Sequence, residues 1–296
     1  MDLVVFDLDG TLLNAGHSIS PRTGRALVEL AERGVAFTVA TGRSLHSARD
    51  VLDGHAFRLP QVFRNGVMTW NPETQILLRH NCLTLAEIEH VITAILAQDV
   101  SPFIATIEPG DRHGDCYDNR YDNRYDNRYD NRHCIYHPPV TREIERGLAD
   151  YYVRSGSLDV KPLAELPADA DIVGISAIGK RLSIDRIAAL IEPEKHLIAY
   201  AGTALQGRDW RWIDIHHTDA SKGKAITRLR EELGATSVLC FGDGLNDLSM
   251  FAVADESFAP ASAGEDIKSA AGTVIGHHDE DGVANYLAWR YSLSID

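Results

Sequence analysis

The chain has 296 residues, and its 29 basic against 43 acidic side chains give a formal net charge of -14. This length exceeds one average domain and suits a core with a sizeable insertion. The acidic balance argues against nucleic acid as a partner, because phosphate backbones demand basic surface, whereas a small phosphorylated substrate needs only a local site.

The same sequence predicts a cytoplasmic protein that does not act at a membrane. No apolar run approaches membrane-spanning length, and the first residues enter a strand pattern without the basic and apolar regions of a signal peptide. The four cysteines include no CxxC pair, which favours reduced thiols.

Two acidic residues follow the first predicted strand. Residues 3–6 are apolar and mostly β-branched, as is typical of a buried parallel strand, and they lead directly to Asp7 and Asp9, with Gly10 and Thr11 next. Open α/β sheets bind their ligands at the carboxyl ends of such strands. Burying two carboxylates is costly unless a cation or a reaction uses them. The alternative is an ordinary strand-to-turn corner, where Asp and Gly are common.

A hydroxyl and a glycine follow the second predicted strand. Ser20 with the proline after it predicts a helix start, and Gly34 predicts that helix's end. Residues 35–40 then form another buried-strand pattern that ends in Thr41 and Gly42. A hydroxyl and a backbone N–H at this position can bind a phosphate.

The middle of the chain predicts an insertion of mixed elements. Asn65 and Gly66 are a hairpin signal between short strands at 61–63 and 67–70. A helical pattern at 85–98 begins the insertion. Further strand and helix patterns occur at 103–107, 142–152, 171–177 and 184–191.

The tetrapeptide Tyr-Asp-Asn-Arg occurs four times in succession at 117–132. A period of four fits neither a strand nor a helix, so we expect a solvated loop or hairpin tip, with a self-associating surface as the alternative. Histidines and cysteines flank the repeat and could bind zinc if its ends meet; the alternative is a loop with scattered His and Cys. These flanking residues are His113, Cys116, His133, Cys134 and His137.

The last third of the chain carries a lysine and a second acidic cluster. Residues 210–215 predict a strand leading back into the core, and Lys222 lies at the start of a helical stretch. The strand pattern at 237–241 is followed by a polar segment at 242–247. Its polar side chains are Asp243, Asn246 and Asp247.

Together these motifs resemble the haloacid dehalogenase-like hydrolases, specifically the Cof-type phosphatases, whose large cap is inserted after the second motif. The resemblance rests on Asp7-Leu8-Asp9-Gly10-Thr11, Thr41-Gly42-Arg43, Lys222-Gly223, residues 242–247 and Glu280-Asp281-Gly282-Val283-Ala284. It implies an α/β fold with a doubly wound, mainly parallel, Rossmann-like core sheet at 1–82 and 210–296. An α+β cap domain, which selects the substrate and contains the repeat, would occupy 83–209.

The resemblance also implies a Mg²⁺-dependent phosphatase that hydrolyses a small phosphorylated metabolite, for example a sugar phosphate, through an aspartyl-phosphate. Asp7 would be the nucleophile, and Asp9 would protonate the leaving alcohol and then activate water. The phosphoryl group would be held by Thr41, Gly42, Lys222 and Asn246. The metal would be held by Asp7, the Asp9 backbone carbonyl and Asp243, with Asp247 acting indirectly.

Two other functions are compatible with the same motifs. One is a phosphotransferase or phosphomutase on this core, and the other is a catalytically silent metabolite-binding protein. The sequence leaves open the physiological substrate, the cap residues that select it and the oligomeric state.

Overall fold

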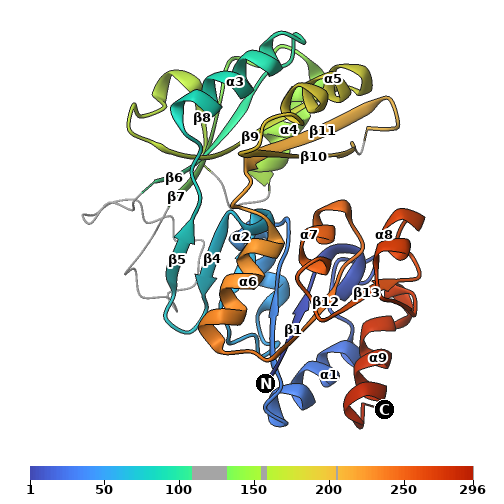
Figure 1. Cartoon of the computed structure of the whole chain (residues 1–296). Coiled ribbons are helices and arrows are strands. Elements are labelled where there is room, and N and C mark those ends of the chain that lie inside the picture. The colour runs from blue at the N-terminus through green and yellow to red at the C-terminus, as the bar shows by residue number, and fades with distance from the viewer. Residues whose placement is uncertain (109–131, 155–158, 205, 296) are drawn as a thin grey trace. The chain divides into compact units, whose positions relative to one another are not determined.

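The computed structural model describes residues 1–108, 132–154, 159–204 and 206–295 (Figure 1). Within these residues, no helix combines the length and the apolar character needed to span a membrane. Contacts divide the chain into two compact units, which we call the core unit and the cap unit. The core unit comprises Met1–Thr74, Leu78–His80 and Asp219–Asp296, and the cap unit comprises Gln75–Leu77 and Asn81–Thr218.

The core unit is built on a five-stranded sheet with the order β14-β13-β12-β1-β2. Every neighbouring pair in this sheet is parallel. The carboxyl ends of β1, β2 and β12 therefore lie at one edge of the sheet, and the polar motifs that follow these strands begin there. The strands are β1 (Asp2–Phe6), β2 (Ala36–Val39), β12 (Ser237–Phe241), β13 (Glu256–Pro260) and β14 (Thr273–Ile275).

Helices cover both faces of this sheet, as the alternation along β1 requires. Leu3 and Val5 pack in one apolar cluster with α6, α7 and α8. Phe6 contacts the tilted ring of Phe241 on the other face, where Tyr286 of α9 also contacts that ring. The helices are α1 (Pro21–Glu32), α2 (Leu45–Leu52), α6 (Lys222–Leu233), α7 (Leu248–Phe251), α8 (Glu265–Ala270) and α9 (Gly282–Tyr291). The predicted doubly wound, mainly parallel fold is confirmed.

A small sheet with the order β3-β4-β5 follows α2, and its pair β3·β4 is antiparallel. A single bridge between Ala40 and Val62 joins it to the end of β2. The predicted hairpin at Asn65 is present as the 3₁₀ turn η2 (Arg64–Gly66) between two antiparallel strands. The strands are β3 (Gln61–Phe63), β4 (Met68–Asn71) and β5 (Ile76–His80).

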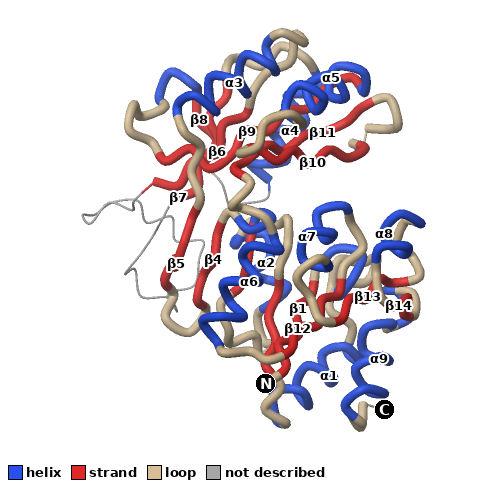
Figure 2. Tube along the Cα trace, viewed as in Figure 1, coloured by secondary structure: helices blue, strands red, loops and turns tan. Residues whose placement is uncertain are grey.

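The cap unit has a six-stranded sheet with the order β10-β11-β9-β6-β7-β8, in which only the described pair β7·β8 is parallel. Helices α3 and α5 pack over one face of it (Figure 2) and share one apolar cluster with its strands. The strands are β6 (Phe103–Glu108), β7 (Arg132–His137), β8 (Asp159–Pro162), β9 (Asp171–Lys180), β10 (Leu197–Thr203) and β11 (Trp210–His217). The helices are α3 (Leu85–Leu96), α4 (Glu143–Arg154) and α5 (Arg181–Ile191).

Strand β11 differs from the sequence-based assignment. The pattern at 210–215 correctly predicts a strand, but that strand pairs with β9 and β10 in the cap sheet rather than returning to the core. Alternating side chains reveal a strand and not its partners, so the predicted boundary at residue 210 falls before β11, whereas the contacts divide the chain at Asp219.

Candidate active site

Lys222 forms a buried ion-pair array with two carboxylates of the core unit. Its Nζ lies 2.7 Å from Asp7 Oδ1 and 2.6 Å from Asp247 Oδ1, and the lysine side chain is fully buried. Asp7 directly follows β1 and its N–H donates to the carbonyl of Phe241, which ends β12. The parallel pairing of β1 with β12 thus places Asp7 and Asp247 together beside Lys222. In the sequence, Asp7 is 215 positions and Asp247 is 25 positions from that lysine.

The array carries more negative than positive charge. Burial alone would lower the pKa of Lys222, but the Asp247 and Asp7 carboxylates outweigh that effect and raise it, so the lysine stays charged. Burial raises the pKa of Asp7 well above its ordinary value, and Asp247 and Asp243 add to the shift while Lys222 opposes it. The ionised form of Asp7 is therefore favoured only when a further positive charge binds beside it.

Asp243 completes the acidic group. Ligand oxygens of Asp7, Asp243 and Asp247 all lie within 4.8 Å of one another. Thr11 Oγ1 donates to Asp243 Oδ1 over 3.0 Å, and the left-handed Gly10 (φ 73°) leaves space that a Cβ would take from the same carboxylate. Burial raises the pKa of Asp243 to about 6, and the charge of Asp247 adds to the effect.

These residues fit a divalent cation with oxygen ligands. Three carboxylates share the single ammonium of Lys222, which leaves about two unbalanced negative charges at full ionisation. Carboxylate oxygens are the donors that Mg²⁺ prefers.

Asp9 is held by two basic side chains. Arg43 grips its carboxylate in a bidentate pair, with Nε 2.7 Å from Oδ2 and Nη2 2.6 Å from Oδ1. His17 Nδ1 lies 3.2 Å from Oδ1, on a backbone with φ of 55°. Burial alone would raise the pKa of Asp9, but Arg43 and, to a smaller extent, His17 lower it. The sequence does not predict this pair, because nothing local links two residues that lie 34 positions apart.

The predicted phosphate-binding residues Thr41 and Asn246 are joined through a residue that the sequence analysis did not assign to the site. Asn65 donates its backbone N–H to the Thr41 carbonyl over 2.9 Å, and its Oδ1 accepts from Asn246 Nδ2 over 2.8 Å. Gly42 lies next to the same amide, since a Cβ there would sit 3.2 Å from Asn65 Oδ1. In the sequence, the Asn65-Gly66 pair indicates only a turn.

The structure does not support a zinc site that uses both His133 and Cys134. The segment at 132–137 is a strand rather than a loop, and Cys134 is buried in the apolar cluster of the cap. Because His133 precedes Cys134 on a strand, the two side chains point to opposite faces and cannot bind one ion together. His113, Cys116 and the repeat up to residue 131 lie outside the described residues.

A second group of candidate ligands comprises His277, His278 and Asp279. The Asp279 N–H donates to His277 Nδ1 over 3.1 Å within the turn that begins η5 (His278–Glu280), and His278 Nδ1 lies 2.7 Å from Ser262 Oγ in the segment after β13. One nitrogen of each ring is thus already engaged, and we assign this group to the local turn.

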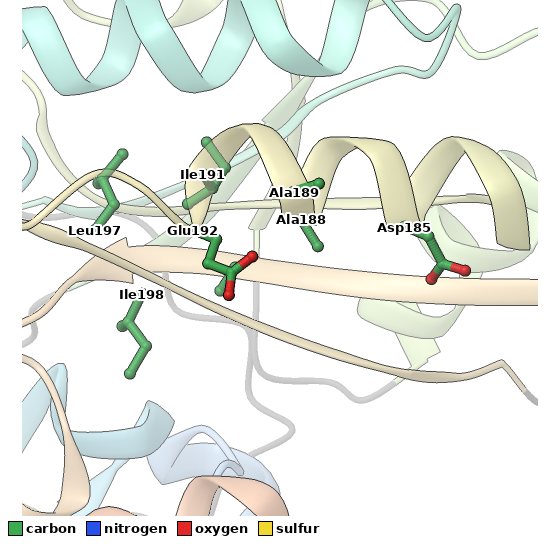
Figure 3. A pocket seen from close by; sticks show the side chains of 8 residues that line it. Asp185, Ala188, Ala189, Ile191, Glu192, Leu197 and Ile198 are labelled. Atoms are coloured by element: carbon green, nitrogen blue, oxygen red, sulfur yellow. The ribbon is translucent and has the colours of Figure 1, made fainter.

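The cap unit has an open hollow of about 490 Å³ between α5 and β10 (Figure 3). Asp185 and Glu192 are its charged lining residues, and the rest of its lining is aliphatic. Arg211 and Arg181 pair with Asp185, but neither lines the hollow. A lining whose charged residues are both acidic does not attract a phosphate, so this hollow does not match the phosphate site that the core motifs describe.

Comparisons with known proteins agree with the motifs. The sequence profile of the haloacid dehalogenase-like hydrolases matches residues 4–287. Phosphatase YwpJ of Bacillus subtilis is 25% identical over 97% of this chain and 99% of its own, and the pyridoxal phosphate phosphatase YbhA of Escherichia coli is 24% identical over 96% and 97%. A solved haloacid dehalogenase-like hydrolase from B. subtilis has the same fold, with a TM-score of 0.73, 22% identity and coverage of 97% of this chain and 99% of that one.

Proposed function

Because the chain belongs to the haloacid dehalogenase-like hydrolases, we propose that it is a Mg²⁺-dependent phosphatase acting through an aspartyl-phosphate on a small phosphorylated metabolite. The observation that carries this proposal is the buried array in which Lys222 links Asp7 and Asp247 beside Asp243. Such an array costs free energy to bury, and a purely structural ion pair would not need three carboxylates. The relatives described above are named as phosphatases, which supports the same activity.

Asp7, Asp243 and the Asp9 backbone carbonyl would hold Mg²⁺, with Asp247 supporting them through its bond to Lys222. When bound, the ion offsets the mutual repulsion of the nucleophilic carboxylate and the phosphate dianion. The remaining positive charge comes from Lys222, whose raised pKa keeps it protonated near the phosphoryl group.

The chain's own residues would perform two displacements at phosphorus. An Asp7 oxygen attacks phosphorus while the ester oxygen leaves and takes a proton from Asp9, giving the aspartyl-phosphate and an alcohol. Asp9 then removes a proton from water, and the resulting hydroxide attacks phosphorus and releases phosphate and free Asp7. Thr41 and Asn246 would donate hydrogen bonds to the phosphoryl oxygens.

Asp9 must leave its present partners to act as an acid. The Arg43 pair favours the ionised carboxylate, which has no proton to give. We therefore propose that substrate binding loosens the Arg43 contact and allows Asp9 to take up a proton.

A sugar phosphate is one member of the proposed substrate class. The sequence has no CxxC pair, which favours reduced cysteines and a cytoplasmic site of action.

The test is phosphate release from a panel of phosphorylated metabolites, with Mg²⁺ and with EDTA. We expect release that needs the metal and is abolished by Asp7→Asn. Asp2→Asn is the matched control, since Asp2 lies at the other end of β1 and accepts a hydrogen bond from Tyr291 there. Metal-independent release, or an active Asp7→Asn variant, would reject the mechanism.

A further inference from the structure

The turn η2 has an unusual backbone for a segment without an assigned role. Three successive residues have positive φ angles: Arg64 at 48°, Asn65 at 57° and Gly66 at 103°. Arg rarely adopts this region, and such conformations persist only where the surroundings hold them in place. The contacts that hold this turn therefore indicate what it serves.

Those contacts reach three segments that carry predicted phosphate-binding residues. Asn65 is buried and bonds both to the Thr41 carbonyl and to the Asn246 amide. Gly66 packs so closely on the Ser221 carbonyl, one residue before Lys222, that a Cβ would overlap it. The turn thus sets the spacing between the ends of β2, η4 (Leu245–Asp247) and the start of α6.

We propose that Asn65 is a positioning residue for the phosphate site, acting through Asn246. The terminal torsion of an asparagine is soft, so a free Asn246 amide would rotate among several orientations. Accepting one of its N–H groups fixes the amide plane and directs the other N–H. This proposal rests on the proposed function, because it assumes that Asn246 binds the phosphoryl group.

The alternative is that Asn65 is present only because asparagine tolerates a left-handed turn. Asn65→Gly separates the two explanations, since glycine accommodates positive φ and removes the amide. Asn65→Ala removes the same amide on a less tolerant backbone. If both variants weaken phosphate binding equally, the loss comes from the missing amide and not from a change in the turn backbone.

The experiment measures binding of inorganic phosphate by calorimetry with Mg²⁺, and kcat/KM for a substrate of the wild type. Asn65→Gly should fold normally yet weaken phosphate binding by about 10-fold, the effect of misplacing one hydrogen bond to a charged group. Combined with Asn246→Ala, it should add less than about 2-fold to the loss caused by Asn246→Ala alone. Ser292→Gly, at a positive φ of 51° outside the site, should leave both measurements unchanged.

Each other result has a definite reading. Unchanged phosphate binding in Asn65→Gly, or additive losses in the double variant, would overturn the positioning role. Phosphate binding without turnover in the wild type would reject the proposed phosphatase and leave the binding test valid. A folded wild type that neither binds nor releases phosphate would overturn both proposals.

Discussion

Replacing Lys222 by methionine should destabilise the core unit selectively. The substitution keeps a long unbranched side chain but removes the ammonium that contacts Asp7 and Asp247. Breaking a buried pair by removing one partner typically costs about 3–5 kcal/mol, because the other charge is left unpaired. Two carboxylates lose their partner here, so we expect a loss within that range at pH 7 without metal.

The pH dependence of this loss follows from the acids left behind. Without Lys222 the pKa of Asp7, already raised by burial, must rise further. Protonation removes the unpaired charge, so the deficit should be largest at neutral pH and should shrink on acidification. Stability changes with pH in this direction because a carboxyl with a raised native pKa binds protons more readily in the folded than in the unfolded protein.

Hydrogen exchange measured by mass spectrometry on the metal-free protein is the appropriate assay, because it reports each unit separately. Amides of β1 and β12 should lose protection in Lys222→Met, while those of β9 in the cap unit provide an internal reference. Lys224→Met is the matched control: Lys224 is half-exposed in its pair with Asp219, and an exposed pair contributes at most about 1 kcal/mol. A loss below about 1 kcal/mol for Lys222→Met would refute the reasoning.

Two further predictions concern single pairs. Arg43→Gln should cost no more than about 1 kcal/mol at pH 7, because the Asp9 carboxylate is half-exposed. Since Arg43 lowers the pKa of Asp9, that loss should vanish as pH falls below the ordinary value of 3.8; melting curves at pH 7 and at lower pH would test this. Burial, assisted by Asp171, raises the pKa of Cys82 from 9.0 to about 11, so native Cys82 should react with iodoacetamide at pH 8 about 100-fold more slowly than in urea. Peptide mapping would measure this rate, and equal rates in the two states would contradict the shift.

The convergence of Asp7 and Asp243 at one edge of the core sheet could be predicted from the sequence, because it depends on local pattern and one topological rule. Asp7 and Asp243 each follow a short apolar run, and parallel strands place their carboxyl ends together. No partner residue had to be known in advance. A local pattern also located the start of α1 correctly: Ser20, followed by a proline, caps this helix by accepting the N–H of Thr23.

Contacts between distant segments could not be predicted in this way. Arg43 and Asp9, or Asn65 and Asn246, meet only after β2, η2 and β12 are assembled, and a single sequence carries no record of such pairs. Strand β11 illustrates the same limit, since its alternation is equally compatible with either sheet. The pattern did not reveal strand β7, because its first residue is the last residue of the repeat and both of its faces mix polar with apolar side chains.

The parallel pairing of β1 with β12 also governs the order in which the protein can mature during synthesis. Met1 and Thr236 meet across this pair although 235 positions separate them, whereas almost all of the cap unit is one continuous stretch. At ribosomal rates of 5–20 residues per second, β1 waits roughly 10 to 50 seconds for its neighbour. The cap sheet can form during that interval, and one edge of β1 can pair with β2, while the edge that later pairs with β12 stays open to chaperones and to neighbouring nascent chains. Slowed translation of the last third would therefore expose the core unit to aggregation for longer than the cap unit.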